Sequence, residues 1–363
     1  MTFVMAGGGT GGHVIPLIAV ARELARLGHE PVFVGTDRGV ESRLVPAAGF
    51  RLEKIRVGGL KNLGAVTRLL SVWRLLVETA GMISRFGRWR PAGVFSLGGY
   101  VAGPPVLAAL LRGVPVVVME PNATPGATNR WIGRWVKRAL VNFEETARFF
   151  PAATTERTGV PVRAEFFALP AKPAGDELTI LITGGSQGSR TLNMAARASW
   201  PLFRDAGIPV RMIHQTGTVM QPEMTQAFAA SGLPGSVEAF ISDMPAAFAI
   251  ADIVVSRSGA GTVSELAAAG KPAILIPFPF AADDHQAANA RAMERAGAAL
   301  TSPDQEWTGD RFFAAIRDLY EHRGRLAAMG QAARTLAFPH AARRAAEILL
   351  ESVDKAGVSR NNK

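Results

Sequence analysis

The chain has 363 residues, of which 48% are hydrophobic, enough for two domains of ordinary size with cores of their own. It contains no cysteine, which excludes disulfides, thiolate nucleophiles and cysteine-based metal sites. No run of about 18 apolar residues is free of charge, and the first residues lack a basic and apolar leader pattern. We therefore expect a protein of the cytosol with no membrane-spanning helix.

The excess of positive charge belongs to one half of the chain. Residues 1–165 carry 21 Lys and Arg against 11 Asp and Glu, a net charge of +10, whereas the remaining residues carry 19 of each kind. A one-sided basic surplus favours a polyanion or an anionic membrane surface as partner, although many basic proteins are merely soluble.

The first half has the pattern of strands that alternate with helices. Short apolar runs bounded by glycine or polar residues predict buried strands, and the longer amphipathic run over residues 14–27 predicts a helix. The predicted strands cover residues 2–6, 31–34, 93–97, 114–119 and 138–142.

The loop after the first predicted strand is rich in glycine. Gly7, Gly9 and Gly12 have the spacing of a dinucleotide-binding loop, in which Asp37 would bind the ribose. His13 closes this loop. It is either a functional imidazole or a hydrogen-bonding residue at the start of the following helix.

Two stretches of the first half, residues 66–90 and 130–138, mix aromatic and apolar residues with Arg and Lys. Helices on an anionic bilayer have this composition, because apolar side chains enter the interface and each basic residue contributes about 1 kcal/mol. The alternative is that the apolar side faces the core and the arginines are solvated. We favour the membrane over nucleic acid, because no nucleic-acid recognition fold is evident. The residues expected at the bilayer are Trp73, Leu76, Arg85, Arg88, Trp89, Trp131 and Trp135.

Polar side chains follow several predicted strands. Tyr100 lies in a second glycine loop, residues 98–103, and Glu120 and Asn122 follow the next strand. Because the ligands of parallel sheets bind outside the carboxyl ends of the strands, we expect these side chains and His13 to line one cleft.

After a proline-rich linker, residues 164–177, the strand and helix pattern starts again, and a glycine loop at residues 184–190 echoes the first one. Two similar halves imply an α/β protein with two doubly wound, Rossmann-like domains that face each other across a cleft. The predicted strands of this half cover residues 178–182, 210–214, 237–241, 252–255 and 273–277.

The most informative stretch, residues 257–265, lies between a predicted strand and a helix that is expected to end at Gly270. Small residues, among them Gly259 and Gly261, let backbone N–H groups approach a ligand. The helix start adds about half a positive charge, which suits a phosphate. Glu265, expected in the first helical turn, is either a helix-dipole residue or a carboxylate placed for the hydroxyls of a ribose.

Taken together, these motifs resemble those of the MurG family, bacterial GT-B glycosyltransferases that move N-acetylglucosamine from a UDP-sugar to a lipid-linked muramyl pentapeptide. The resemblance covers nearly the whole chain and departs at Pro121, where the family often has Gln. The motifs are GGGTGGH at 7–13, GGYVAGP at 98–104, EPN at 120–122, GVPVR at 159–163, GGSQGSR at 184–190, RSGAGTVSE at 257–265 and DHQAAN at 284–289.

The resemblance implies that residues 164–339 bind UDP-N-acetylglucosamine. Residues 1–163, joined by a C-terminal helix over residues 340–363 that forms part of a hinge, would bind the acceptor and the membrane. Ile241 would meet the uracil, Glu265 the ribose, and Gln286 with Asn289 the sugar hydroxyls. The residues implied for the donor are Thr10, Gly11, Gly12, Asn122, Arg163, Ser186, Ile241, Arg257, Ala260, Gly261, Thr262, Val263, Ser264, Glu265, Gln286 and Asn289. For Arg257, a fixed cation beside the phosphates and a structural ion pair stay open.

The acceptor would lie at Gly11, Gly12, His13 and Tyr100 by the same resemblance. Transfer with inversion needs a base for the acceptor hydroxyl and stabilisation of the departing UDP. His13 is the first candidate for the base and Glu120 is its rival. The sequence has no D-x-D motif, so we expect no metal and no other cofactor.

The acceptor of the family is lipid I, and its product is lipid II. The resemblance therefore implies a peripheral protein at the cytoplasmic face of the bacterial inner membrane, with proteins of cell-wall synthesis as partners. Two alternatives stay open. One is another GT-B enzyme such as a UDP-N-acetylglucosamine 2-epimerase, which would need no lipid, and the other is a non-catalytic, nucleotide-regulated membrane-binding module.

Overall fold

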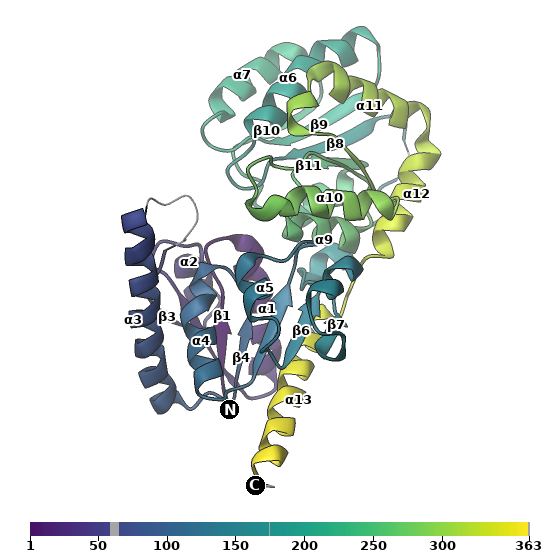
Figure 1. Cartoon of the computed structure of the whole chain (residues 1–363). Coiled ribbons are helices and arrows are strands. Elements are labelled where there is room, and N and C mark those ends of the chain that lie inside the picture. Colours follow the sequence, from purple (N-terminus) through teal and green to yellow (C-terminus); the bar gives the residue numbers. More distant parts are fainter. Residues whose placement is uncertain (59–64, 174, 362–363) are drawn as a thin grey trace. The chain divides into compact units, whose positions relative to one another are not determined.

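The structure is a computed structural model, and it describes residues 1–58, 65–173 and 175–361. Contacts divide the chain into two compact units, one made of Met1–Val162 and Phe338–Lys363 and the other of Arg163–Ala337. Each unit holds one sheet, and every strand pair in both sheets is parallel (Figure 1). The predicted α/β class with two doubly wound sheets is confirmed.

In the first unit the strand order is β3-β2-β1-β4-β5-β6-β7, so the order reverses between β1 and β4. The central strands are apolar and buried, as predicted, whereas the sequences of the edge strands β3 and β7 are polar and gave no such signal. The strands are β1 (Thr2–Ala6), β2 (Glu30–Gly35), β3 (Arg51–Lys54), β4 (Gly93–Ser96), β5 (Val116–Glu120), β6 (Arg138–Val141) and β7 (Thr155–Arg157).

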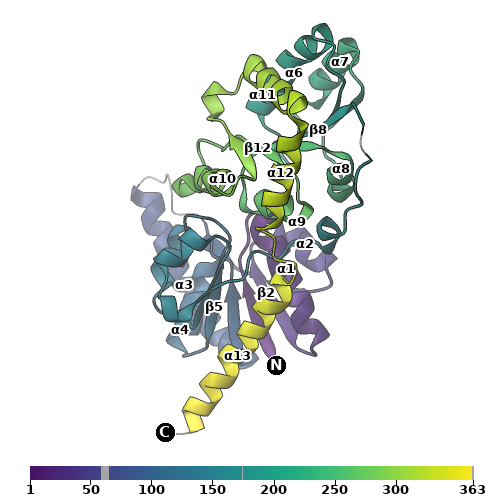
Figure 2. The ribbon, with the colours of Figure 1, turned by 90° about the vertical axis from the view of Figure 1, so that its right-hand side faces the viewer.

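Helices cover both faces of this sheet. Side chains of α1, α2 and α13 pack on one face, and those of α3, α4 and α5 pack on the other. The chain's last helix, α13, lies beside α1 (Figure 2); residues 362–363 of the predicted C-terminal helix lie outside the described residues. The elements are α1 (Gly11–Arg26), α2 (Glu41–Ala47), α3 (Ala65–Trp89), η1 (Tyr100–Ala102), α4 (Gly103–Leu111), α5 (Ala127–Ile132), η2 (Glu144–Phe149), η3 (Ala152–Thr154) and α13 (Ala341–Asn361).

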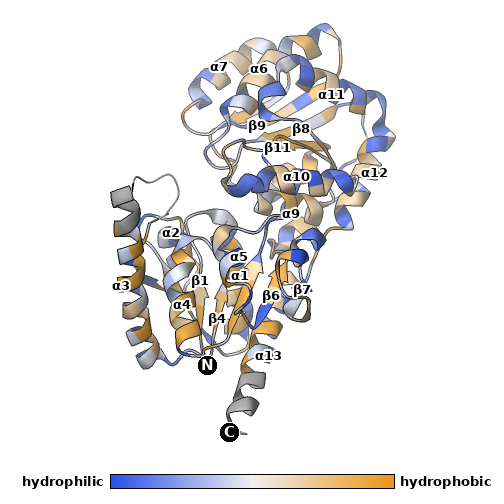
Figure 3. Cartoon of the chain, viewed as in Figure 1, coloured by the Kyte–Doolittle hydropathy of each residue, from blue (hydrophilic) through white to orange (hydrophobic). Residues whose placement is uncertain are grey.

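The second unit has the strand order β10-β9-β8-β11-β12-β13. Colouring by hydropathy shows its inner strands, like those of the first unit, as apolar (Figure 3). The strands are β8 (Leu178–Thr183), β9 (Val210–Gln215), β10 (Gly235–Glu238), β11 (Ile253–Ser256), β12 (Ala273–Leu275) and β13 (Ala299–Thr301).

The helices of the second unit begin with recognisable signals. The side chains of Ser189, Asp243 and Thr308 accept hydrogen bonds from the backbone N–H three residues later and so cap α6, α8 and α11. The elements are η4 (Ala164–Phe167), α6 (Arg190–Asp205), α7 (Gln221–Ser231), α8 (Met244–Ile250), α9 (Ala260–Ala269), η5 (Ala282–Asp284), α10 (His285–Arg295), η6 (Asp304–Glu306), α11 (Gly309–Glu321) and α12 (Arg323–Arg334).

Two segments of this unit differ from the prediction. The strand predicted over residues 237–241 ends at Glu238, because the N–H of Ile241 turns to the side chain of Gln215 instead of a neighbouring strand. The predicted linker begins with a packed turn, since Phe166 of η4 is fully buried. Within the described part of the chain, no helix is both long and apolar enough to cross a bilayer.

Candidate active site

The predicted glycine loop before α9 is shorter than expected. Gly259 already has the extended geometry of an N-cap (φ −62°, ψ 149°), so the helix begins at Ala260. Glu265 consequently lies in the second turn of α9 and not in the first. The predicted stop is confirmed, because Gly270 is left-handed (φ 61°, ψ 39°).

The start of α9 is open to a ligand. Its first turn, which the structure describes in full, holds no acidic residue. A Cβ added to Gly259 or Gly261 would meet no atom within 4 Å, so there is free space beside the backbone. The side chains of Val263 and Ser264 are buried, which leaves Thr262 half-buried at the surface. N–H groups at a helix start with open space before them suit a phosphate.

Among the residues that the structure describes, the carboxylate of Glu265 has one charged partner. Its Oε1 lies 3.7 Å from Nη2 of Arg163, and its side chain is 26% exposed. Burial raises the pKa of Glu265 to about 7, and the charge of Arg163 acts in the opposite direction. No described residue donates a hydrogen bond to this carboxylate, so it keeps its capacity to accept hydrogen bonds from a ligand. Arg163 itself belongs to the second unit, where its guanidinium lies 4.9 Å above the ring of Phe166.

The glycine loop after β8 is held by Gln215, a residue that no sequence motif marks. Its amide nitrogen donates to the carbonyl of Gly185 at 2.8 Å, and its amide oxygen accepts from the N–H of Ile241 at 2.8 Å. Gln215 therefore ties the loop carrying exposed Ser186 to the segment carrying Ile241. Its only sequence signal is its position at the end of a strand.

Arg257 is fixed by partners on three sides. Its Nη1 lies 2.5 Å from Oδ1 of Asp304 and donates to the carbonyls of Ile276 and Pro277 at 3.1 and 3.2 Å. Its Nη2 donates to Oγ of Ser189 at 2.7 Å. The side chain is only 12% exposed. The sequence left two roles open for Arg257, a cation beside the phosphates and a structural ion pair. The structure shows the ion pair with Asp304.

The residues expected to hold the donor sugar differ in their exposure. Oε1 of Gln286 accepts a hydrogen bond from the N–H of Phe278 at 3.0 Å. The backbone carbonyl oxygen of Gln286 accepts one from the hydroxyl of Ser258 at 2.8 Å. Asn289 is fully buried, and its amide donates to the carbonyl of Ser258 at 3.0 Å. In this structure the Asn289 side chain thus lies inside the unit and not at its surface, because it ties α10 to the segment after β11.

In the first unit, His13 and Tyr100 come together at the carboxyl ends of β1 and β4. Nδ1 of His13 lies 3.3 Å from the carbonyl oxygen of Gly8. A Cβ added to Gly99 would be 3.7 Å from the imidazole, and one added to Gly9 would be 3.7 Å from the Tyr100 ring. Both glycines are left-handed, with φ of 78° and 88°, so the close approach of the two loops depends on glycine.

The glycine loop of the first unit is supported from behind by Glu41, which no sequence pattern singles out. The buried carboxylate accepts hydrogen bonds from the N–H of Gly9 at 2.8 Å and from the N–H and hydroxyl of Thr36 at 2.9 and 2.8 Å. Burial alone would raise the pKa of Glu41, but these hydrogen bonds lower it below its ordinary value. The N–H of Gly9 is therefore taken by Glu41, which fixes the loop from behind.

Glu120 is surrounded by donors from its own unit. Oε1 accepts from the N–H and the amide of Asn122 at 3.0 and 3.1 Å, and Oε2 accepts from the N–H of Gly126 and the amide of Asn129 at 3.1 and 3.0 Å. Burial raises the pKa of Glu120 to about 7, and the hydrogen bonds oppose this shift. The segment after β5 is thus folded around the carboxylate, which is only 2% exposed.

Several exposed apolar side chains of the first unit lie on α3, on α5 and in the turn after α5, and the two helices pack on the same face of the sheet. Trp73 is 64% and Leu76 56% exposed. The exposed rings of Trp131 and Trp135 meet edge to face with centroids 5.4 Å apart. Exposed aromatic residues beside arginines are typical of an interaction surface.

Two of the residues predicted to meet the bilayer are placed differently. Trp89 is half-buried and packs against the core, and the side chain of Arg85 is 26% exposed. The reason is that the second half of α3 lies on the sheet, where Met82 and Phe86 are fully buried. Arg88 is exposed, as predicted.

Comparisons with known proteins agree over nearly the full length. Residues 3–141 match the glycosyltransferase family 28 N-terminal domain, and residues 179–345 match the glycosyltransferase family 28 C-terminal domain. The chain is 61% identical to a protein of Solibacter usitatus (strain Ellin6076) over 96% of both chains, and 40% identical to one of Myxococcus xanthus (strain DK1622) over 97% of this chain and 93% of the relative. Both relatives are named UDP-N-acetylglucosamine–N-acetylmuramyl-(pentapeptide) pyrophosphoryl-undecaprenol N-acetylglucosamine transferase.

Solved structures show the same relationship. The crystal structure of Acinetobacter baumannii MurG matches with a TM-score of 0.81 and 32% identity, over 96% of this chain and 99% of that one. A UDP-GlcNAc 2-epimerase from Neisseria meningitidis matches with a TM-score of 0.70 over 97% of this chain and 100% of that one, but at 13% identity. The second likeness is one of fold alone.

Proposed function

We propose a mechanism from one premise: the chain belongs to the MurG family of N-acetylglucosaminyltransferases. It transfers N-acetylglucosamine from UDP-N-acetylglucosamine to the muramyl sugar of lipid I, and so forms lipid II for peptidoglycan synthesis. The observation that carries this function is the identity of 61% over 96% of both chains with a transferase of that name. The 2-epimerase alternative has only a shared fold in its support.

We propose that the second unit binds the donor at the start of α9. The N–H groups of Ala260, Gly261 and Thr262 would meet the diphosphate, since open space lies beside this turn. Val263 and Ser264 would contribute only through the backbone, because their side chains are buried. Exposed Ser186 would contact the same diphosphate from the loop after β8. Helix N–H groups so placed stabilise the charge that develops on the departing UDP.

Glu265 is our candidate for the ribose hydroxyls, because it has no internal hydrogen-bond donor among the described residues. The charge of Arg163 favours the ionised form of this carboxylate against the effect of burial, and we propose that Arg163 also reaches the donor. The N–H of Ile241 already donates to Gln215, so we propose that its carbonyl oxygen faces the uracil. Gln286 would contact the sugar.

Two residues of the donor set receive positioning roles. Asn289 would hold the segment after β11, since its amide is buried against Ser258. Arg257 would fix the ends of β11 and β12 through its bonds to Asp304 and the two carbonyls.

We propose His13 as the base that accepts the proton of the acceptor C4 hydroxyl, which then displaces UDP with inversion at the anomeric carbon. The imidazole lies between two glycine loops, in the first turn of α1. Thr10, Gly11 and Gly12 would present the neighbouring backbone to the diphosphate of the acceptor, and Tyr100 would face its sugar. Glu120 instead shapes the segment that carries Asn122, because all four of its hydrogen bonds come from that region.

We propose that the protein docks peripherally on the cytoplasmic face of the membrane through the α3 and α5 surface. Trp73, Leu76, Trp131 and Trp135 would enter the interface, and Arg88 would meet anionic headgroups. Charge reversal at Arg88 should weaken binding to anionic vesicles by more than about fivefold, since the loss of one basic residue alone removes about 1 kcal/mol and the new negative charge adds repulsion. Charge reversal at exposed Arg22, on α1 and the opposite face, is the matched control. Equal losses in both variants would contradict a specific docking face.

The assay for the function measures UDP release from UDP-N-acetylglucosamine with and without a lipid-linked muramyl pentapeptide. We expect release only with the acceptor, together with a disaccharide product. Epimerised sugar would support the 2-epimerase alternative, and binding without turnover would support the non-catalytic module.

A further inference from the structure

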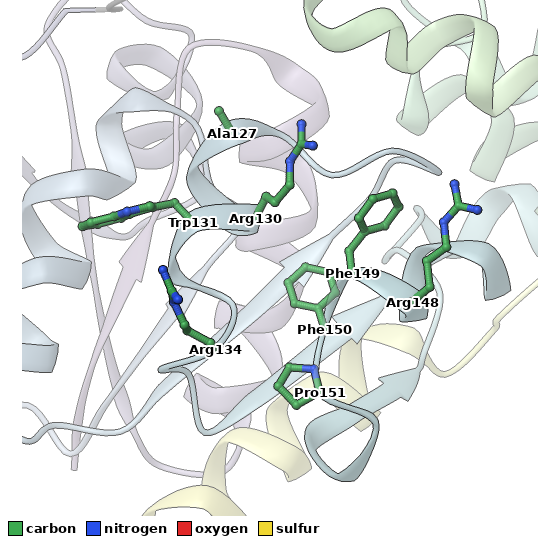
Figure 4. Close-up of a pocket in the computed structure, with 8 residues that line it drawn as sticks. All are labelled: Ala127, Arg130, Trp131, Arg134, Arg148, Phe149, Phe150 and Pro151. Atoms are coloured by element: carbon green, nitrogen blue, oxygen red, sulfur yellow. The ribbon is translucent and has the colours of Figure 1, made fainter.

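A pocket of the first unit lies beside the acceptor loops and has no part in the mechanism above. It has a volume of about 600 Å³ and is formed by α5, the turn after it and η2 (Figure 4). The side chains that give the pocket its chemistry are Arg130, Trp131, Arg134, Arg148, Phe149 and Phe150.

The pocket carries three positive charges that the protein does not neutralise. No acidic residue lines it, and within the described residues the guanidinium groups of Arg130, Arg134 and Arg148 form no ion pair and no hydrogen bond. Two of these groups instead lie over aromatic rings. The guanidinium of Arg134 is 4.4 Å from the centre of the Trp135 ring, and that of Arg148 is 4.9 Å from the centre of the Phe149 ring. Guanidinium groups without an ion-pair partner favour carboxylates or phosphates as ligands, which they bind with two parallel hydrogen bonds.

The two ends of the pocket differ. Arg130 and Arg148 extend on either side of Phe149, whereas Trp131 and Arg134 lie at the opposite end (Figure 4). The second end adjoins the exposed Trp131 and Trp135 pair that we assign to the bilayer. The end with Arg130 and Arg148 therefore combines two guanidinium groups with an aromatic ring, which suits a ligand that carries both carboxylates and apolar groups.

Helix α5 connects this pocket to the acceptor loops. The hydroxyl of Thr128 donates to the carbonyl of Gly99 at 3.3 Å, and the amide of Asn129 donates to Glu120 at 3.0 Å. Arg130 is the next residue along the helix. Because α5 has only six residues, the contact with Gly99 and the pocket lie within about 9 Å along one helix, a distance that an extended peptide can span.

The acceptor of the proposed reaction has such an extension. Its pentapeptide leaves the muramyl ring from the carbon next to the one that carries the reacting hydroxyl, and the peptide ends in a carboxylate. We infer that Arg130 and Arg148 bind the carboxylates of the acceptor's pentapeptide, with Phe149 against its apolar side chains. The inference rests on the proposed function and adds to it a specificity site for the peptide.

The test compares two water-soluble acceptors that carry a short prenyl chain in place of the long one. One has the pentapeptide with free carboxylates, and the other has the same peptide with every carboxylate converted to an amide. For the unaltered protein we expect a KM about tenfold higher with the amidated acceptor and a similar kcat, because charged hydrogen bonds are lost. Equal KM values for the two acceptors would overturn the inference. Absence of transfer with either acceptor would instead contradict the proposed function.

Variants then assign the effect to the pocket. Arg130→Gln with Arg148→Gln should raise the KM for the carboxylate acceptor about tenfold and leave that for the amidated acceptor unchanged. The double Lys variant should recover part of the loss, and Arg22→Gln, which removes an exposed charge from α1, should change neither value. Loss of binding to phosphatidylglycerol vesicles with an unchanged ratio of KM values would assign the pocket to the membrane and overturn the inference. If the Gln variant does not fold, the two acceptors with the unaltered protein still decide.

Discussion

Glu120 and Glu265 are two carboxylates with similarly raised pKa values and opposite surroundings. Burial raises the pKa of each to about 7. Glu120, at the end of β5, accepts four hydrogen bonds from the residues around it, whereas Glu265, in α9, has among the described residues only the charge of Arg163 at 3.7 Å. The shift in pKa alone therefore does not separate the structural role proposed for Glu120 from the ligand-binding role proposed for Glu265. The number of internal donors does.

This difference makes His13 the base to test, because a carboxylate that already accepts four hydrogen bonds from neighbouring residues is poorly placed to accept a proton from substrate. His13→Ala should lower kcat by about 10² to 10⁴, the usual contribution of a general base, with little change in the KM for UDP-N-acetylglucosamine. Steady-state kinetics with a saturating acceptor measure both values. A variant with nearly full kcat would return Glu120 to consideration as the base.

The open carboxylate should affect the donor and not the fold. Glu265→Ala should raise the KM for UDP-N-acetylglucosamine by about 10- to 150-fold, because a hydrogen bond to a charged group contributes about 1.5 to 3 kcal/mol. The acceptor KM serves as the internal control and should stay the same. An unchanged donor KM would be incompatible with a ribose role for Glu265.

The enclosed carboxylate should show the reverse pattern. Glu120→Gln replaces one accepting oxygen with an NH₂ group that faces two donors, so the free energy of unfolding should fall by about 1 to 3 kcal/mol. Chemical denaturation measures this loss. A stable variant with a raised donor KM would place Glu120 among the binding residues instead.

The smallest expected effect is a change of donor binding with pH. This pH dependence also separates the two carboxylates. A carboxylate accepts ribose hydroxyls better when it is ionised, and the ordinary pKa of 4.5 is raised to about 7 at Glu265. The KM for UDP-N-acetylglucosamine should thus fall by up to about tenfold from about pH 6 to about pH 8. Glu265→Gln should flatten this profile, and Glu120→Gln should leave its shape intact. A profile that Glu265→Gln does not flatten would assign the titration to another group.

Local sequence patterns predicted part of the fold and part of the site. The apolar strands and the stop at Gly270 follow from local patterns, and so does the placement of His13, Tyr100 and Glu120 at the strand ends. Polar edge strands such as β3 lack the apolar signal and were not predictable in this way. Local patterns also placed the start of α9 too late, because glycine and serine there are compatible with either loop or helix.

Contacts between distant residues lie beyond such patterns. Glu41 reaches Gly9 across 32 residues, and Gln215 reaches Ile241 across 26. The pairing of Arg257 with Asp304 spans 47 residues, which left its role open from the sequence alone. Each of these contacts depends on the order of the strands, which a single sequence does not fix.

The most direct test of the account is a crystal structure with UDP-N-acetylglucosamine bound. We expect both ribose hydroxyls within hydrogen-bond distance of the Glu265 carboxylate and the diphosphate at the N–H groups of Gly261 and Thr262, with the four hydrogen bonds of Glu120 unchanged. A diphosphate bound away from α9, or a ribose held by any other carboxylate, would contradict the account.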